Sequence, residues 1–141
     1  EFYLILIAAG AAVSGGSFWR LLVGTIVMIL GGYLGQSGLM GVSVTFGFII
    51  GMIGWAVIIW EIFRGEASQA ASSNASVSSA FNAMRLIVLV GWAIYPLGYV
   101  FGLMMQTVDP NTLNWVYNLA DFVNKILFGL IIWNAAVKDT A

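Results

Sequence analysis

Apolar residues fill five long stretches of the chain, and only short polar connections separate them. The last three stretches are each longer than the roughly 20 residues that a helix needs to cross a bilayer. Each must be helical, because a spanning backbone has to satisfy its own hydrogen bonds, and barrel strands of about ten residues do not fit such runs. We therefore expect an all-α transmembrane fold with helices over Phe2–Val13, Phe18–Leu34, Gly41–Phe63, Ala80–Met105 and Leu113–Val137.

The first stretch is too short to span, and it begins abruptly at Glu1 without the basic region of a signal peptide. We expect that the chain starts inside a helix and is the C-terminal piece of a larger bundle. The connections between stretches are short, which makes neighbouring helices antiparallel within a single domain, residues 1–141. Three are expected to be tight turns and the fourth a longer loop: Ser14–Ser17, Gln36–Met40, Gln106–Thr112 and Gly65–Ser79.

Composition supports a membrane protein and excludes several kinds of chemistry. Hydrophobic residues make up 61% of the chain and charged residues 8%, and the mean hydropathy is +0.98. The net charge of −1 gives no indication of a nucleic-acid partner. Cysteine and histidine are both absent, so thiol catalysis, the usual general base and the usual zinc ligands are excluded, and no metal site is expected.

The basic residues outside the segment cores indicate how the bundle is oriented. With alternating crossings, all of them fall on one side: Arg20, Arg64, Arg85 and Lys138. The opposite side carries no lysine or arginine. The positive-inside rule therefore places the first side, with the C-terminus, in the cytoplasm.

Two charged residues lie near the middle of the fifth stretch. Lys125 is about 18 Å along a helix from Leu113, where a charge costs about 2.5–3.5 kcal/mol on insertion scales. Asp121 lies one turn earlier on the same face. Such a face must line a protein interior or a wet cavity, and further polar residues extend it: Asn114, Tyr117, Asn118 and Asn124.

This pair has two interpretations from the residues alone. It is either a structural ion pair that holds helices together, or a site where Lys125 is used chemically. A desolvated lysine is more readily neutral, and a neutral amine condenses with an aldehyde to form a Schiff base. Asp121 is placed to balance the positive charge of such a group when it is protonated.

Other segments offer walls for an apolar ligand, although ordinary packing explains each pattern equally well. Trp92, Tyr95, Pro96 and Tyr99 follow the spacing of one helical face, and Pro96 predicts a kink. Similar sets occur in the third and second stretches: Phe48, Gly51 and Trp55, and then Met28 and Gly32. Small residues four apart predict close helix packing at Gly31/Gly35, Gly47/Gly51 and Gly98/Gly102.

Three motifs give the chain a resemblance to microbial rhodopsins of the proteorhodopsin group. They are EFYLIL at residues 1–6, GWAIYP at 91–96 and YNLADFVNKILFGLIIWN at 117–134. The resemblance implies a seven-helix bundle that binds all-trans retinal covalently. About four and a half of its helices are present here, from the second half of helix C through helix G, so helices A and B and the first half of C are missing.

The resemblance also implies roles for individual residues. Lys125 would carry the retinal Schiff base, Asp121 would be the second member of its counterion complex, and Glu1 would be the cytoplasmic proton donor. The residues that would line the pocket along the polyene are Trp92, Tyr95, Pro96 and Tyr99. Those near the ring would be Trp55, Gly51 and Phe48, and another wall would be formed by Met28 and Gly32.

The function implied is a light-driven outward proton pump, not an enzyme, in the inner membrane of a bacterial cell. An acid at Glu1 is typical of such pumps, and a helix F bent at Pro96 would swing to admit water. A photosensory rhodopsin that signals to a membrane partner is the alternative, and a transporter or structural bundle using Asp121–Lys125 as an ion pair is a third. Family members commonly form pentamers or hexamers. The ring of Phe48 should fill the gap through which some relatives bind a carotenoid antenna, so no antenna is expected.

Overall fold

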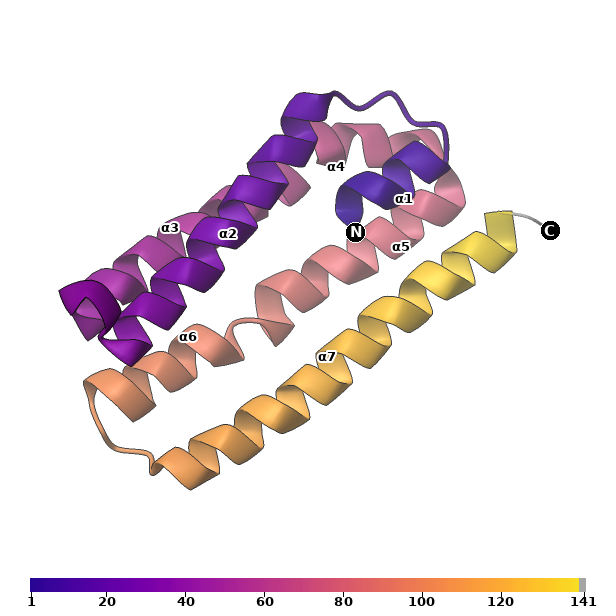
Figure 1. The fold of residues 1–141 in the computed structure, drawn as a ribbon. Coiled ribbons are helices and arrows are strands. Elements are labelled where there is room, and N and C mark those ends of the chain that lie inside the picture. The colour runs from indigo at the N-terminus through magenta and orange to yellow at the C-terminus, as the bar shows by residue number, and fades with distance from the viewer. Residues whose placement is uncertain (140–141) are drawn as a thin grey trace.

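The structure is a computed structural model that describes residues 1–139, and every element in that range is a helix (Figure 1). This confirms the all-α prediction. Elements η1 and η2 are 3-10 helices, and η3 and η4 are π-helices. In chain order the elements are α1 (Phe2–Ala8), α2 (Gly15–Ser37), η1 (Leu39–Gly41), α3 (Val44–Phe63), α4 (Glu66–Ala70), η2 (Ala71–Ser73), α5 (Ala75–Leu86), η3 (Ile87–Gly91), α6 (Ile94–Gly98), η4 (Tyr99–Met104) and α7 (Pro110–Asp139).

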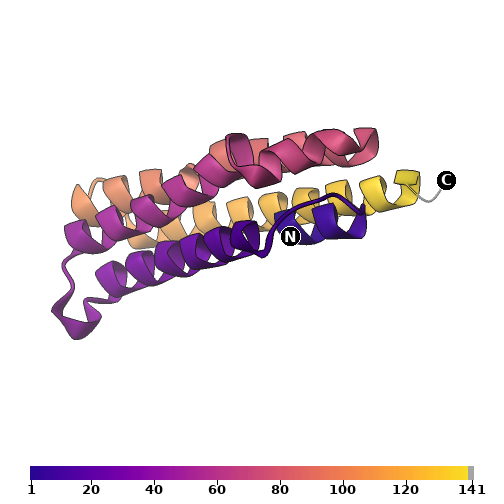
Figure 2. The same cartoon turned by 90° about the horizontal axis from the view of Figure 1, so that it is seen from above.

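Four stretches of the described chain are long and apolar enough to cross a membrane: Gly15–Ser37, Val44–Ser73, Ala75–Met104 and Pro110–Lys138. Seen from above, the axes of these long helices are roughly aligned (Figure 2). The third stretch joins α5, η3, α6 and η4, and we call it the α5–α6 segment. Neighbouring helices are antiparallel, as the short connections predicted (Figure 1).

Helices α2 and α3 form the most extensively packed pair, and glycines bring their backbones into contact. A Cβ atom built on Gly47 would lie 2.4 Å from the Gly35 Cα, and one on Gly31 would lie 2.6 Å from the Gly51 nitrogen. No larger side chain fits at this distance. The predicted packing of small residues four apart is therefore confirmed for this pair.

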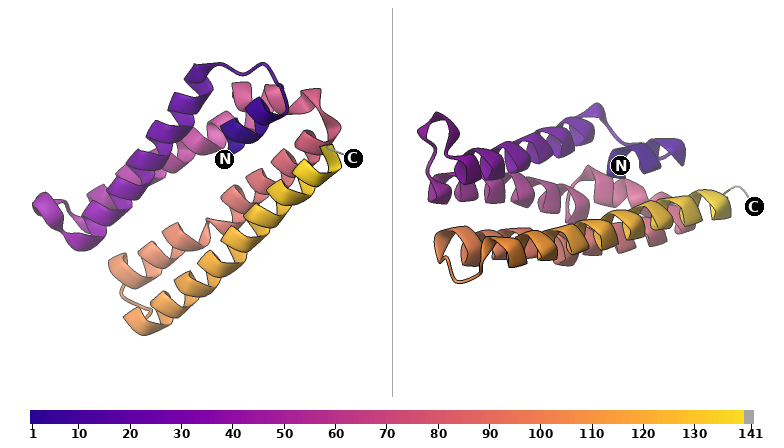
Figure 3. Two further views of the ribbon diagram at one scale, coloured as in Figure 1. Left: turned by 45° about the vertical axis from the view of Figure 1, so that its right-hand side comes forward. Right: turned by 60° about the horizontal axis from the view of Figure 1, so that its bottom comes forward.

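Helix α7 lies alongside the α5–α6 segment over its length (Figure 3). The short helix α1 packs at one end of this pair, where Leu6 is fully buried. The Phe2 ring stands edge-on to the rings of Phe81 and Phe128, with centroids 5.0 and 5.7 Å apart. These contacts form the apolar core that joins the first element of the chain to its last two long helices.

One predicted helix end and one predicted helix start are wrong at the first connection. The helix expected over Phe2–Val13 ends at Ala8, because Gly10 takes a left-handed φ of 71° that a helix cannot continue. The turn expected at Ser14–Ser17 is instead the beginning of α2, with Ser14 as its N-cap. This earlier start and an end at Ser37, three residues beyond Leu34, give α2 its 23 residues, which is enough to span.

The long loop predicted over Gly65–Ser79 is also wrong, since almost all of it is helical. Helices α4 and η2 occupy its first part, and α5 begins at Ala75 rather than Ala80. The Asn74 side chain accepts a hydrogen bond of 3.1 Å from the Val77 amide and so caps α5. Serine and alanine residues are common in loops, but alanine is also the strongest helix former, and a capped start suits this sequence.

The basic residues do gather at one end of the bundle. Helix α2 begins there, α3 ends there, α5 begins there and α7 ends there (Figure 1). The Arg85 guanidinium lies 4.8 Å from the centre of the Phe63 ring, which ties it to the end of α3. Arg20, Arg64, Arg85 and Lys138 therefore belong to the same half of the molecule, as predicted.

Candidate functional site

A carboxylate and a lysine lie one turn apart on α7, at the level of the break in the α5–α6 segment. Helix α7 is regular at this point, and the Lys125 Nζ donates a hydrogen bond of 2.7 Å to Asp121 Oδ2. In the described chain 76% of the Lys125 side chain and 42% of the Asp121 side chain are exposed. The ammonium group is thus held by an anion while remaining accessible.

The second carboxylate oxygen of Asp121 is held from the neighbouring helix. The Tyr95 hydroxyl donates a short hydrogen bond to Asp121 Oδ1. The Tyr117 hydroxyl in turn donates to the Tyr95 carbonyl at 3.0 Å, and the two rings pack with centroids 5.5 Å apart. Donors on two helices therefore fix both oxygens of one carboxylate, which makes it a rigid neighbour for Lys125.

The α5–α6 segment breaks beside this pair, which confirms the predicted kink. Pro96 has no N–H, and its ring would clash with the carbonyl one turn earlier, that of Trp92. That carbonyl instead accepts from the Tyr95 amide at 3.1 Å, and the Trp92 amide bonds back to Ile87 at 3.0 Å in a π turn. The break therefore falls at Trp92 and Ala93, four and three residues before the proline.

The residues predicted to line a pocket make contacts between the α5–α6 segment and two different helices, α7 and α3. Tyr95 contacts α7, whereas Tyr99 is buried and its hydroxyl donates to the Val44 carbonyl of α3 at 3.1 Å. The Phe48 ring packs on Tyr99 with centroids 5.4 Å apart. The Trp55 indole N–H donates to the Val88 carbonyl at 3.2 Å. Aromatic side chains from α3 and the α5–α6 segment thus lie between these helices.

The remaining predicted residues have other surroundings. A Cβ atom on Gly51 would lie 3.3 Å from the Met28 carbonyl and 3.4 Å from the Gly32 nitrogen, so these three meet where α2 crosses α3. A Cβ atom on Gly32 would meet nothing within 4 Å. Glu1 is exposed at the start of α1, and no hydrogen bond joins it to Lys125 in the described part of the chain.

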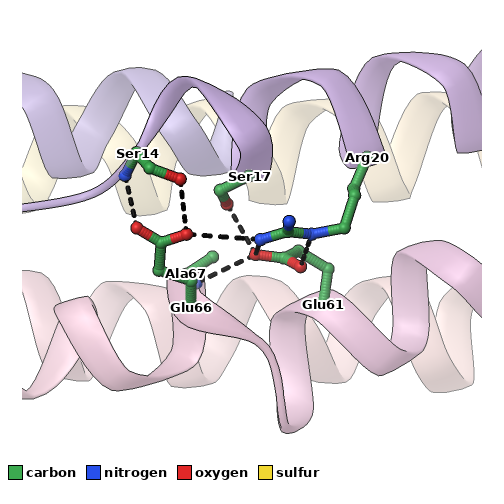
Figure 4. Close-up of polar contacts among 6 residues, drawn as sticks. All are labelled: Ser14, Ser17, Arg20, Glu61, Glu66 and Ala67. Carbon is green, nitrogen blue, oxygen red and sulfur yellow. Dashed lines mark hydrogen bonds and ion pairs between the residues drawn. The ribbon is translucent and has the colours of Figure 1, made fainter.

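The sequence interpretation missed a charged cluster at the end of the bundle that holds the basic residues (Figure 4). Glu61 is fully buried there. Its carboxylate accepts from Arg20 Nε at 2.6 Å, from the Ser17 hydroxyl at 2.6 Å and from the Ala67 amide at 3.1 Å. The signal for this cluster in the sequence is a glutamate two residues before the end of an apolar stretch, where a buried charge needs a partner.

Glu66 extends the cluster to the link between α1 and α2. It accepts hydrogen bonds from both the amide and the hydroxyl of Ser14, the latter at 2.6 Å, and from Arg20 at 3.3 Å. Figure 4 shows these side chains meeting between two neighbouring segments. The cluster joins α2, the end of α3 and the start of α4.

The chain belongs to the bacteriorhodopsin-like protein family, whose model matches residues 2–139. It is 52% identical to the blue-light absorbing proteorhodopsin of Gamma-proteobacterium Hot 75m4 and 50% identical to the green-light absorbing proteorhodopsin of Gamma-proteobacterium EBAC31A08. In both cases the whole chain is matched. The chain spans 56% of the length of each of these curated relatives.

Solved structures give the same result. The crystal structure of the blue light-absorbing proteorhodopsin from Med12 matches with a TM-score of 0.77 and 47% sequence identity, over 99% of this chain and 60% of that one. The resemblance stated from the three motifs is therefore confirmed. The protein has the helical fold of this family and is similar in sequence and structure to light-absorbing proteorhodopsins.

Proposed function

We propose that the protein is a light-driven outward proton pump in which Lys125 Nζ carries retinal. One observation carries this proposal: a single carboxylate, Asp121, is bonded at one oxygen to Lys125 and at the other to Tyr95. An ion pair that only held helices together would join two different elements. Here both charged groups lie on α7, and the helix opposite contributes a neutral donor.

The residues present fit the retinal chromophore by their chemistry. A primary amine condenses with an aldehyde, and the positive charge on the product needs a fixed anion nearby. Lys125 supplies an exposed amine and Asp121 the anion. The flanking aromatic residues, Trp92, Tyr95 and Tyr99, with Phe48 and Trp55 on α3, suit a flat, apolar molecule. We assign the remaining pocket positions to Pro96, which follows the break, and to Gly51, Met28 and Gly32, which meet where α2 crosses α3.

Bound retinal would supply the absorption of light and the change of shape that follows. The chain's own residues would then stabilise and return the proton held at Lys125 Nζ. Asp121, kept in place by Tyr95, would stabilise that proton at rest. We assign Glu1 as the donor that returns a proton to Nζ from the cytoplasmic side. The break at Trp92 would let the α5–α6 segment move and admit water.

The same proposal includes the membrane in which the protein lies and its orientation there. We assign the end that carries Arg20, Arg64, Arg85 and Lys138, with the C-terminus, to the cytoplasmic side of a bacterial inner membrane. Residues 1–141 would form part of one retinal-binding domain, whose further helices would cover the exposed face at Lys125. Assembly into pentamers or hexamers and the absence of a carotenoid antenna belong to this proposal as well.

Illuminated cells that express the complete protein with added retinal provide the test. A pump acidifies the medium in light, and a protonophore abolishes the signal. The matched control is Lys125→Ala, which retains the fold of α7 but has no amine. Pigmented cells that show no acidification would favour the photosensory alternative, and a protein that stays colourless with retinal would reject both.

A further inference from the structure

The break in the α5–α6 segment leaves the Gly91 carbonyl without its helical donors. In an α-helix it would accept from the Tyr95 amide, but that amide bonds to Trp92 instead. In a π-helix it would accept from residue 96, which is a proline and has no N–H. A carbonyl in the middle of a spanning segment needs another partner, because the bilayer core has no water to donate a hydrogen bond to it.

Asn124 of α7 supplies that partner. Its side-chain amide donates to the Gly91 carbonyl at 3.1 Å. The fit depends on glycine, since a Cβ atom built on Gly91 would lie 2.4 Å from Asn124 Oδ1 and 3.1 Å from its Cγ. Asn124 and Gly91 therefore form a matched pair, in which the absent side chain of one makes room for the amide of the other.

Two further side chains hold the segment on either side of this bond. The Trp55 indole donates to the Val88 carbonyl, and the Tyr117 hydroxyl donates to the Tyr95 carbonyl. These contacts fix the segment above and below the break. The Asn124 bond acts at the break itself, and Asn124 is the residue next to Lys125 in the chain.

We propose that Asn124 is a positioning residue that clamps the broken α5–α6 segment to α7 at Gly91, and that this clamp holds the segment in its resting arrangement. The inference rests on the proposed function and deepens it. The backbone that carries Lys125 is thereby joined directly to the segment that would move. A change at Lys125 would reach the break through one residue and one hydrogen bond.

A double-mutant cycle with Asn124→Ala and Gly91→Ala tests the clamp, with the exposed Asn134→Ala on α7 as control. The first readout is the thermal stability of the protein without retinal. Gly91→Ala alone should lower the melting temperature, because its methyl group displaces the amide. In the Asn124→Ala background the methyl group fits, and the same substitution should have little effect. Equal losses in both backgrounds would overturn the proposal.

The second readout is the slow phase of absorbance recovery after a flash, with retinal bound. Each single variant should lengthen it about fivefold, the factor that one hydrogen bond of ordinary net strength provides. The double variant should be no slower than the singles, and Asn134→Ala should match the unchanged protein. A purely structural bond would lower stability and leave recovery unchanged, which would also overturn the proposal.

The two proposals fail in distinguishable ways. If the unchanged protein forms no pigment with retinal, the proposed function has failed, and the stability cycle still decides whether Asn124 and Gly91 are coupled. If pigment forms and recovery is the same in all variants, the pump proposal stands and the clamp is rejected.

Discussion

Asp121 Oδ2 lies 2.7 Å from Lys125 Nζ, and its other oxygen accepts the Tyr95 hydroxyl. One carboxylate thus links the lysine to the helix that breaks at Trp92. A salt bridge between residues four apart on an exposed helix contributes only about 0.3–0.5 kcal/mol to stability. The energy of this pair is therefore a poor explanation for placing two charges at the middle of a spanning helix, and its chemistry is a better one.

Lys125→Ala should abolish pigment formation in protein supplied with retinal. The amine is the only group on this face of α7 that can bond covalently to an aldehyde. Absorbance in the visible range after purification is the measurement. Lys138→Ala, which removes the other lysine of the chain at the end of α7, should leave the colour unchanged. Covalent colour in Lys125→Ala would refute the assignment.

Glu1→Gln should leave the colour nearly unchanged and slow the return of the proton to Lys125 Nζ by about a hundredfold, the range in which a positioned acid acts. Flash-induced absorbance changes measure this rate. Glu66→Gln is the matched control, since Glu66 is a partly exposed carboxylate bonded to Ser14. If Glu1→Gln recovers at the rate of the unchanged protein, Glu1 is not the donor.

Glu61→Gln should destabilise the protein by about 1–3 kcal/mol, because the amide keeps the shape but loses the charge-assisted bonds. The buried carboxylate holds Arg20 and Ser17 of α2 and the Ala67 amide. Glu66→Gln changes the same chemistry at a more exposed position and should cost less. Thermal unfolding of the two variants side by side is the measurement, and equal losses would show that burial does not decide the cost.

Asp109 should make stability depend on pH in the acid range. The hydroxyl and amide of Thr112, and then the Asn111 amide, bond to its carboxylate and lower the pKa of Asp109. A carboxyl with a depressed folded pKa stabilises the protein above its unfolded value, about 3.9, and this contribution is lost as the pH falls through the folded pKa. Asp109→Asn keeps an N-cap without a titrating group. Its melting temperature should fall less than that of the unchanged protein between about pH 4 and pH 2, and parallel curves would contradict the assignment.

Much of the helical framework could be predicted from the sequence because the bilayer leaves few options. Apolar stretches such as Gly41–Phe63 must be helical if they span, and the structure places α3 over Val44–Phe63. The ends were less predictable. The Ser/Ala-rich residues after Gly65 carry no strong apolar pattern, and their helical state depends on the Asn74 cap and on burial of Val77 and Phe81.

The lysine and its aspartate could be predicted because charges at such depth stand out in an apolar stretch. The partners of other polar groups could not. Arg20 and Glu61 are 41 residues apart, and only the antiparallel packing of α2 on α3 brings them together. The Asn124 bond to Gly91 likewise depends on a break whose position, four residues before Pro96, follows from backbone geometry and not from composition.

Phe48 leads to a prediction about light harvesting. Its ring packs on Tyr99, whose hydroxyl is anchored to the Val44 carbonyl, so we expect the ring to stay in place and to fill the space that a second pigment would need. Pigmented protein mixed with a carotenoid should show no energy transfer to retinal in its excitation spectrum. Phe48→Gly removes the ring while leaving the Tyr99 anchor intact, and it is the variant in which transfer would appear. Transfer in the unchanged protein would show that the ring does not close this site.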